Sequence, residues 1–194
     1  MELELKAVVP DPAALGKRLR DAGFGPTFTG RMRDRRFDRN GEFAAVGEVV
    51  RVRAYQGENG IREVIGWKGT TSVNADGYKQ REEVESGLCD GAPGDALLER
   101  LGFGVVHAID RFVEIFDVYG AMLRIEWYPD ADTLLEVEGD GAAIERAIGI
   151  TGLERTGFTS EPLVAFAERF QERSGRPARL ALLHPDEFPE HWPQ

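Results

Sequence analysis

The stretch Glu2-Leu3-Glu4-Leu5-Lys6-Ala7-Val8-Val9 alternates charged and apolar residues over its first positions. A period of two is typical of a β-strand with one charged and one apolar face. The same alternation returns in three later stretches, Val50-Arg51-Val52-Arg53, Leu123-Arg124-Ile125-Glu126 and Leu135-Glu136-Val137-Glu138. We therefore predict a protein built mainly of strands.

Eight strands are predicted, most of them joined as antiparallel hairpins. They cover residues 2–9, 30–38, 49–55, 61–68, 79–86, 105–118, 122–128 and 133–138. Helices are expected over 13–22 and 93–101, where apolar residues recur at helical spacing, and after the capping residues Asp140 and Thr159 or Ser160. Eight antiparallel strands can close into a barrel, which removes their edges. The predicted fold class is α+β, an eight-stranded antiparallel β-barrel with helices packed outside.

Length and composition fit one domain with a tail. Of the 194 residues, 1–174 are expected to form a single domain, and 175–194, with four prolines, a C-terminal tail. Cys89 is the only cysteine, which excludes an internal disulfide and a Cys-based zinc site. The chain has no apolar run near the ~20 residues that span a bilayer. Its charged N-terminus lacks the apolar segment of a signal peptide. We expect a cytoplasmic protein without a membrane partner.

The charge balance narrows the class of partner. The chain has 24 Lys and Arg against 34 Asp and Glu, a formal net charge of −10. Affinity for long nucleic acids comes largely from excess basic residues, so we expect no long nucleic acid as partner. A local basic pocket for a small anion is compatible with this total.

The charged strand faces are expected to point into the barrel. The predicted helices need an apolar sheet face to cover, and if they lie outside, the charged face lines the interior. Buried charges of both signs must pair or bind a charged ligand. Carboxylates hold Mg²⁺ or Mn²⁺, while Arg and Lys hold phosphate oxygens. The pattern therefore favours a polyphosphate bound with its divalent cation.

Charged motifs follow one another in a fixed order along the chain. They are Glu2-x-Glu4-x-Lys6, Asp34-Arg35-Arg36-Phe37-Asp38, Val50-Arg51-Val52-Arg53, Trp67-Lys68-Gly69, Arg81-Glu82-Glu83-Val84-Glu85 and the acidic strands 123–126 and 135–138. This series resembles the ExExK, DxxFD, paired-arginine, lysine-glycine, REExE and closing acidic strands of the CYTH superfamily. That group, the triphosphate tunnel metalloenzymes, contains class IV adenylate cyclases, thiamine triphosphatases and inorganic triphosphatases. The resemblance implies an eight-stranded antiparallel tunnel that binds a triphosphate with Mg²⁺ or Mn²⁺.

The resemblance also implies roles for individual residues. The metal ligands would be Glu2, Glu4 and Glu138, supported by Glu126 and Glu136. The residues that contact phosphates would be Lys6, Arg51, Arg53, Lys68, Arg81, Arg111 and Arg124. Among them, Lys6, Lys68 and Arg111 would take part in catalysis. Glu83 and Glu85 would orient the basic groups or hold a second metal.

A dense basic stretch, Arg31, Arg33, Arg35 and Arg36, allows two interpretations. It can be a solvated strand whose arginines pair with acidic neighbours. It can also extend the binding surface towards a nucleoside or another anion, with Arg33 and Arg35 as the better candidates. We include Arg33 among the candidate substrate-binding residues.

Three positions depart from the superfamily pattern and bear on the reaction. Ile109 stands where a lysine two residues before Arg111 is usual, Glu126 replaces an aspartate, and Thr159-Ser160-Glu161-Pro162 lacks the usual C-terminal tyrosine or lysine. The resemblance favours hydrolysis of inorganic triphosphate, a nucleoside triphosphate or thiamine triphosphate.

Two alternatives to hydrolysis stay open. A class IV adenylate cyclase would form cyclic AMP and pyrophosphate from ATP. Cyclase members carry a His-Phe element before ExExK, for which a sequence starting at Met1 has no room, and we therefore expect hydrolysis. A non-catalytic polyphosphate or nucleotide binder would fit the lost lysine and tyrosine. A homodimer is compatible with the resemblance.

Overall fold

The computed structural model describes residues 2–89 and 94–193, with only the backbone of Glu2. Its strands are β1 (Glu2–Val8), β2 (Pro26–Asp38), β3 (Val49–Gly57), β4 (Gly60–Lys68), β5 (Ser72–Val73), β6 (Lys79–Arg81), β7 (Glu83–Gly87), β8 (Gly104–Val118), β9 (Ala121–Trp127) and β10 (Leu134–Gly139). Its α-helices are α1 (Pro12–Asp21), α2 (Glu42–Ala45), α3 (Gly94–Arg100), α4 (Gly141–Thr151) and α5 (Leu163–Ser174). This order is the mixed α and β composition that the alternation predicts.

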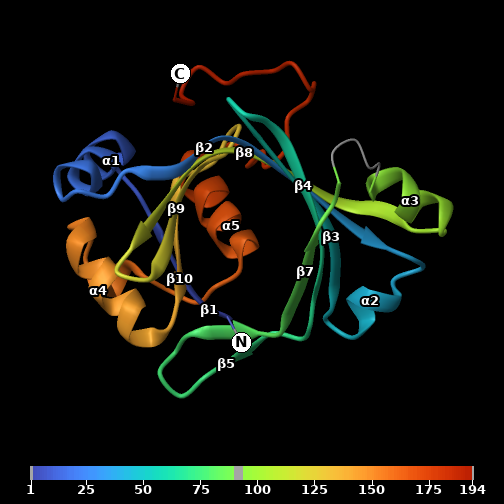
Figure 1. The fold of residues 1–194 in the computed structure, drawn as a ribbon, viewed down its shortest axis with the longest axis horizontal. Coiled ribbons are helices and arrows are strands. Elements are labelled where there is room, and N and C mark those ends of the chain that lie inside the picture. Colours follow the sequence, from blue (N-terminus) through green and yellow to red (C-terminus); the bar gives the residue numbers. More distant parts are fainter. Residues whose placement is uncertain (1, 90–93, 194) are drawn as a thin grey trace.

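The strands of the described residues form one antiparallel sheet. Their order is β5-β6-β1-β10-β9-β8-β2-β3-β4-β7, and in Figure 1 they outline a ring. Hydrogen bonds within the described residues do not join the two ends of this order, so the expected closed barrel of eight strands is not confirmed. Ten strands replace eight because the stretch predicted as 79–86 is interrupted at Glu82 and because Ser72–Val73 forms a short strand in a predicted loop.

The interrupted stretch connects two distant strands of the sheet. β6 pairs with β1, where Arg81 lies opposite Glu2, and β7 pairs with β4, where Glu83 lies opposite Lys68. Between the two strands, the carbonyl of Glu82 accepts a hydrogen bond from the Gly69 amide at 2.9 Å. The chain itself therefore passes from the β1 side of the sheet to the β4 side.

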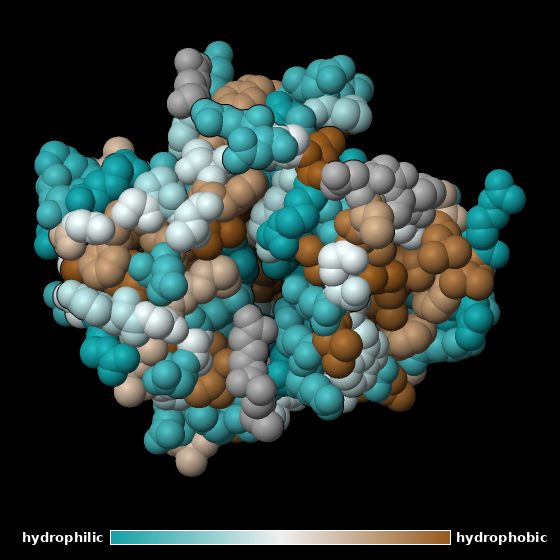
Figure 2. Space-filling model, in the orientation of Figure 1, coloured by the Kyte–Doolittle hydropathy of each residue, from teal (hydrophilic) through white to brown (hydrophobic). Residues whose placement is uncertain are grey.

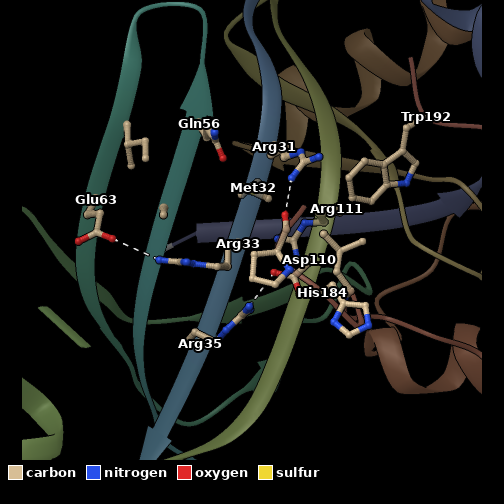
Figure 3. Close-up of a pocket in the computed structure, with 14 residues that line it drawn as sticks. Arg31, Met32, Arg33, Arg35, Gln56, Glu63, Asp110, Arg111, His184 and Trp192 are labelled. Carbon is tan, nitrogen blue, oxygen red and sulfur yellow. Dashed lines mark hydrogen bonds and ion pairs between the residues drawn. The ribbon is translucent and has the colours of Figure 1, made fainter. Parts of the chain in front are cut away.

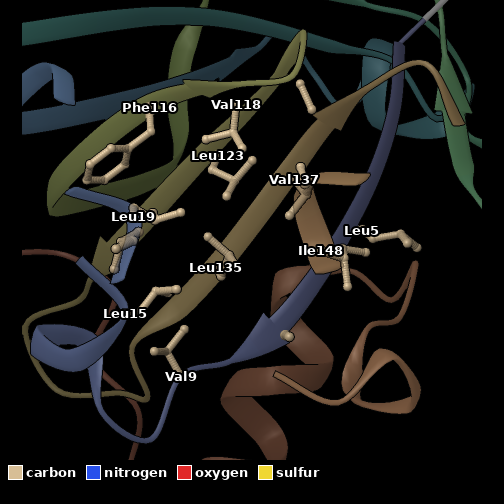
Figure 4. Close-up of a cluster of buried hydrophobic side chains, with 14 of the residues drawn as sticks. Leu5, Val9, Leu15, Leu19, Phe116, Val118, Leu123, Leu135, Val137 and Ile148 are labelled. Carbon is tan, nitrogen blue, oxygen red and sulfur yellow. The ribbon is translucent and has the colours of Figure 1, made fainter. Parts of the chain in front are cut away.

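The apolar face of the sheet is covered by helices, as predicted. Leu5, Leu123, Leu135 and Val137 are buried in the largest apolar cluster. Helix α1 contributes Leu15 and Leu19, and helix α4 contributes Ile144 and Ile148 (Figure 4). Each such side chain stabilises the fold by about 1.5–3 kcal/mol when fully buried. This cluster fixes the charged residues, which alternate with the apolar ones, on the opposite face of these strands.

Helix α5 corrects the expectation that every helix packs outside. Its Phe166 packs in one cluster with Ile109, Tyr128 and Leu134. Ile109 is two residues from Arg111, and Leu134 is two residues from Glu136, so both share the charged face. Figure 1 shows α5 within the ring of strands. Apolar residues at these positions of the charged face need a cover, which α5 provides.

The C-terminal tail, described for residues 175–193, runs along β8 and β2 on the outer face. The Asp110 amide donates to the Leu180 carbonyl at 2.8 Å, and Arg31 donates to the carbonyls of Pro185 and Glu187 at 2.8 and 3.0 Å. Trp192 is buried in the cluster that covers the outer face. The described part of the tail is therefore a surface wrap.

The exposed surface combines hydrophilic and apolar areas. Figure 2 shows apolar residues gathered over the region of α3, where Val84, Leu97 and Leu101 are exposed. A narrow hollow lies near the middle of the same face. Among the described residues, none of the helices has the length and apolar character needed to cross a bilayer.

Candidate functional site

Six neighbouring strands place charged side chains on one face, which we call the inner face. Alternate residues of β1, β10, β9, β8, β2 and β3 point to this side. The buried charged residues on it are Glu4, Lys6, Asp34, Arg51, Arg53, Arg111, Arg124, Glu126 and Glu136. Charged residues are rarely this buried unless they are paired or bind a ligand. The inner face is therefore the first place to look for a site.

Three carboxylates of the inner face lie close enough to share one ion. The β1–β10 register sets Glu4 opposite Glu138 and Lys6 opposite Glu136. One oxygen each of Glu4, Glu136 and Glu138 lies within 4.8 Å of the other two. Three carboxylate oxygens suit a hard divalent cation such as Mg²⁺ or Mn²⁺. The side chain of Glu2, also predicted as a ligand, lies outside the described residues.

Basic groups neutralise these carboxylates in the structure. Lys6 Nζ lies 2.7 Å from Glu4 and 2.7 Å from Glu136, and Lys79 also contacts Glu4. Burial opposes ionisation of Glu136, but Arg124 and Lys6 outweigh it and hold its pKa well below the usual range. Burial lowers the pKa of Lys6, but Glu136 and Glu4 outweigh it and raise that pKa. Glu136 is therefore ionised at neutral pH.

Glu126 has a different environment from the three-carboxylate group. Its Oε1 accepts from Arg124 Nε at 2.7 Å and lies 3.0 Å from Arg111 Nε, and its Oε2 accepts from the Tyr128 hydroxyl. Arg124 also contacts Glu136. The structure thus places Glu126, predicted as a supporting metal ligand, among arginines and a phenol, where it positions Arg124 and Arg111.

Asp34 joins the arginines of two strands and was missing from the predicted site. It accepts from Arg53 Nε and Nη2 at 2.7 and 3.0 Å, and from Arg111 Nη2 at 2.9 Å. Burial opposes ionisation of Asp34, but Arg53 and Arg111 outweigh it and hold its pKa well below the usual range. Its place opposite Arg53 in the β2–β3 register is a signal that strand alternation could have given.

The predicted basic residues of β3, β4 and β6 lie around the β7 glutamates. Arg51 pairs with Glu85 and Lys68 pairs with Glu83. Arg81 donates to the Gly69 carbonyl, with its Nε at 2.9 Å. Glu83 and Glu85 therefore each contact one of the predicted phosphate-binding residues.

Arg36 is a second residue that the predicted site omitted. It shares the face of Asp34, two residues away, and lines a cavity of about 380 Å³ with Arg81 and His107. Within the described residues no carboxylate forms an ion pair with Arg36. Burial lowers its pKa, and although Asp34 opposes this, Arg51 is among the neighbouring cations that lower it further. Since no ion pair with a described carboxylate neutralises Arg36, the cavity has a basic group that can contact an anion, beside the lining carboxylates Asp38 and Glu48.

Arg33 lies away from the inner face. It alternates with Asp34 along β2, so its side chain points to the outer face and contacts Glu63 at 3.5 Å (Figure 3). A cavity of about 220 Å³ lies beside it on that outer face. The structure thus separates Arg33 from the other predicted substrate-binding residues.

The positions that depart from the superfamily pattern border the inner face. Ile109 is buried under Phe166 of α5. The amide and carbonyl of Thr159 each bond to the backbone of Lys6 at 2.8 Å, so the segment 159–162 begins beside β1. Neither position supplies a basic group.

Comparison of the sequence finds no protein-family model and no curated protein that matches the chain. Solved structures match its fold. The PH1819 protein of Pyrococcus horikoshii has 20% identity and a TM-score of 0.68, over 91% of this chain and 100% of that one. A candidate adenylate cyclase from Vibrio parahaemolyticus has 16% identity and a TM-score of 0.70, over 86% of this chain and 97% of that one.

A third similar structure is a candidate adenylyl cyclase from Hippeastrum with a dominant triphosphatase activity. It has 18% identity and a TM-score of 0.50, over 95% of this chain and 93% of that one. At these identities the likeness concerns the fold. The chain therefore has a CYTH-like fold.

Proposed function

We propose that this protein is a metal-dependent triphosphatase that hydrolyses inorganic triphosphate, a nucleoside triphosphate or thiamine triphosphate at its inner face. The observation that carries the proposal is the juxtaposition of the group Glu4, Glu136 and Glu138 with buried arginines and a lysine on the same face. A triphosphate bound with a divalent cation presents the complementary charges. The activity of the Hippeastrum protein, which shares the fold, supports the same substrate class.

The three-carboxylate group fits Mg²⁺ or Mn²⁺ by the chemistry of its donors. A bound divalent cation would neutralise phosphate charge and polarise the transferred phosphoryl group. Lys6 and Lys79, which contact Glu4 in the structure, would then exchange this contact for phosphate oxygens. The carboxylates thus hold the lysines at the place where the substrate binds.

The arginines supply the fixed part of the phosphate site. Asp34 orients Arg53 and Arg111 with hydrogen bonds of 2.7–3.0 Å, and Glu126 holds Arg111 from the other side. Donors that are held in place before substrate binds stabilise developing negative charge without reorganisation. In this proposal Lys6, Lys68 and Arg111 stabilise the transferred phosphoryl group while water attacks in line.

The experiment is a product assay with defined substrates. The protein is incubated with tripolyphosphate, ATP or thiamine triphosphate and Mg²⁺ or Mn²⁺, and orthophosphate, pyrophosphate and cyclic AMP are measured separately. Release of orthophosphate supports the proposal. Cyclic AMP with pyrophosphate would assign a cyclase instead, and binding without turnover would assign a non-catalytic binder.

Matched variants exclude a contaminating phosphatase. Glu138→Gln removes one carboxylate of the group, whereas Glu145→Gln changes a glutamate of α4 that bonds to Tyr78 outside it. Both variants are purified in the same way as the wild type. Activity that disappears in the first and persists in the second belongs to the inner face.

A further inference from the structure

A cavity of about 220 Å³ lies on the outer face of the sheet, and Arg111 is the residue of the proposed triphosphate site that is also among its lining residues. This cavity lies between the outer side of β2, β3 and β4 and the C-terminal tail (Figure 3). We call it the outer cavity. Because successive residues of a strand point to opposite faces, β2 separates it from the inner face. The contacts of the residues that line the outer cavity are therefore described separately from the inner face.

Three arginines of β2 line the outer cavity, and their partners differ. Arg31 is bound by tail carbonyls and lies over the Phe188 ring, with 5.1 Å between its guanidinium carbon and the ring centroid. Arg35 forms a close ion pair with Asp110 at 2.9 Å. The contacts of Arg31 and Arg35 are therefore structural: Arg31 binds the tail, and Arg35 binds β8. Arg33 is the arginine between them.

Among residues 2–89 and 94–193, the contacts of Arg33 with acidic groups are long. Its Nη2 lies 3.5 Å from Glu63 and 4.0 Å from Asp95, and its side chain is 48% exposed. Charge-assisted hydrogen bonds of arginine to carboxylate are typically about 2.7–2.9 Å long. A guanidinium has five N–H donors, so Arg33 keeps donors free for an anion. His184 of the tail lines the same cavity and adds a second candidate donor.

The remaining walls of the outer cavity are largely apolar. Ala54, Ile61, Leu182 and Trp192 are among the apolar lining residues, and Ile61 is 59% exposed. The lining also has the polar residues Gln56, Glu63, Asp110 and Arg111, of which Asp110 pairs with Arg35. Ligand sites commonly combine apolar walls with a few polar groups that orient the ligand, and drug-sized ligands need roughly 300–1,000 Å³. The smaller volume here fits a small ligand. An exposed isoleucine beside a guanidinium favours an anion that carries an apolar group.

We propose that the outer cavity binds a small organic anion, a phosphate monoester or a carboxylate with a short apolar body. The anionic group lies against Arg33 and His184, and the apolar body lies against Ile61 and Leu182. The proposed site is distinct from the three-carboxylate group, which lies on the inner face. Its ligand approaches from solvent through the side that Arg33 leaves exposed.

The test measures binding of phenyl phosphate by isothermal titration calorimetry, in EDTA and at constant ionic strength. Benzoate carries the same apolar body on a carboxylate, and inorganic phosphate lacks the apolar body. We expect phenyl phosphate, benzoate or both to bind one to one, and more tightly than inorganic phosphate. Arg33→Ala should weaken binding about tenfold or more, because a charge-assisted hydrogen bond is lost.

Control variants make the result specific to the outer cavity. Arg39→Ala removes an arginine of similar exposure, 47%, that pairs with Glu42 and does not line the cavity, and it should bind like the wild type. Ile61→Ser should weaken phenyl phosphate but not inorganic phosphate. Arg36→Ala, which alters the inner face, should leave phenyl phosphate binding unchanged.

Clear outcomes would overturn the proposal. They are no binding to the wild type at millimolar concentration, equal binding by Arg33→Ala and Arg39→Ala, or equal affinity for phenyl phosphate and inorganic phosphate. Loss of binding in Arg36→Ala would assign the anion to the inner face instead. Since Arg33 and Ile61 are exposed, their variants should fold, and thermal unfolding verifies this.

Discussion

Asp34 of β2 and Arg111 of β8 meet across neighbouring strands at 2.9 Å, and the same carboxylate binds both Nε and Nη2 of Arg53 on β3. One buried aspartate therefore holds arginines from the strands on either side of it. The β2 register makes this arrangement possible, because Asp34 lies opposite Arg53 on β3 and opposite Ile109 on β8, two residues from Arg111.

Replacing Asp34 by asparagine tests how strongly the inner face depends on this carboxylate. Asp34→Asn keeps the size of the side chain but removes the carboxylate that pairs with Arg53 and leaves Arg111 paired with Glu126 alone. We expect the free energy of unfolding to fall by about 3–5 kcal/mol, the usual cost of removing one partner of a buried ion pair. Urea denaturation measures it, with Asp117→Asn, an exposed aspartate on β8, as the control. Equal stability of the two variants would contradict the role assigned to Asp34.

Glu138→Gln tests the three-carboxylate group. Loss of one charge should lower metal-dependent kcat/KM roughly 100-fold or more, since charge neutralisation at the phosphoryl group dominates this chemistry. Titration with Mn²⁺ should show weaker binding in parallel. Glu145→Gln serves as the control, and full activity of Glu138→Gln would exclude the group as the metal site.

Arg36→Ala separates a substrate role from a structural one. Because no ion pair with the described residues neutralises Arg36, its removal should not lower the free energy of unfolding. The KM for triphosphate should rise about tenfold, as expected for the loss of one charge-assisted hydrogen bond. Arg35→Ala, its neighbour on the outer face, should leave this KM unchanged. A lower stability with an unchanged KM would assign Arg36 to the fold instead.

The stability of the protein should decrease in acid. Asp34 and Glu136 have pKa values held well below their ordinary 3.8 and 4.5. As the pH falls through these ordinary values, the unfolded chain binds protons that the native carboxylates do not, and unfolding becomes easier. The free energy of unfolding should be level above about pH 5 and fall progressively below it. Asp34→Asn should show a smaller decrease, and a flat profile from pH 5 to 3 would contradict the paired, ionised state.

Phe166→Ala tests the contact of α5 with the inner face. Phe166 is buried against Ile109, Tyr128 and Leu134, and its truncation should lower the free energy of unfolding by about 3–5 kcal/mol. Val164→Ala, on the same helix and 56% exposed, should change it by no more than about 0.5 kcal/mol. If the denaturation curves of the two variants coincide, α5 is not packed in this way.

The strands could be predicted from the sequence because their pattern is local. Alternation predicted a strand over 105–118, and β8 is Gly104–Val118. The interruption at Glu82 was not predictable in this way, because it arises where the pairing partner changes from β1 to β4. Local periodicity contains no information on which distant strand a residue will meet.

The site was predictable to the extent that strand register followed from alternation. Glu4, Glu136 and Glu138 were all candidates, and the structure brings them together. Arg33 was chosen over Arg36 although β2 places Arg36, and not Arg33, on the face of Asp34. Counting alternate residues from Asp34 would have selected Arg36 as the candidate substrate-binding residue in place of Arg33.

The position of α5 could not be predicted from its sequence. Its apolar residues indicate a buried helix face but do not say which side of the sheet it covers. The apolar residues Ile109 and Leu134, on the face that carries the charged side chains, were the available signal. It was weak because single apolar residues are also common on solvated faces.

Strand β2 has a consequence for how this sequence can change over time. Its odd-numbered arginines support the tail and the outer cavity, while its even-numbered residues Asp34 and Arg36 belong to the inner face. A point substitution alters one of these surfaces and spares the other. An insertion or deletion of one residue just before Arg31 would move the residues that follow it to the opposite face and alter both surfaces at once. Homologous chains should therefore vary in residue type along β2 but keep its length constant.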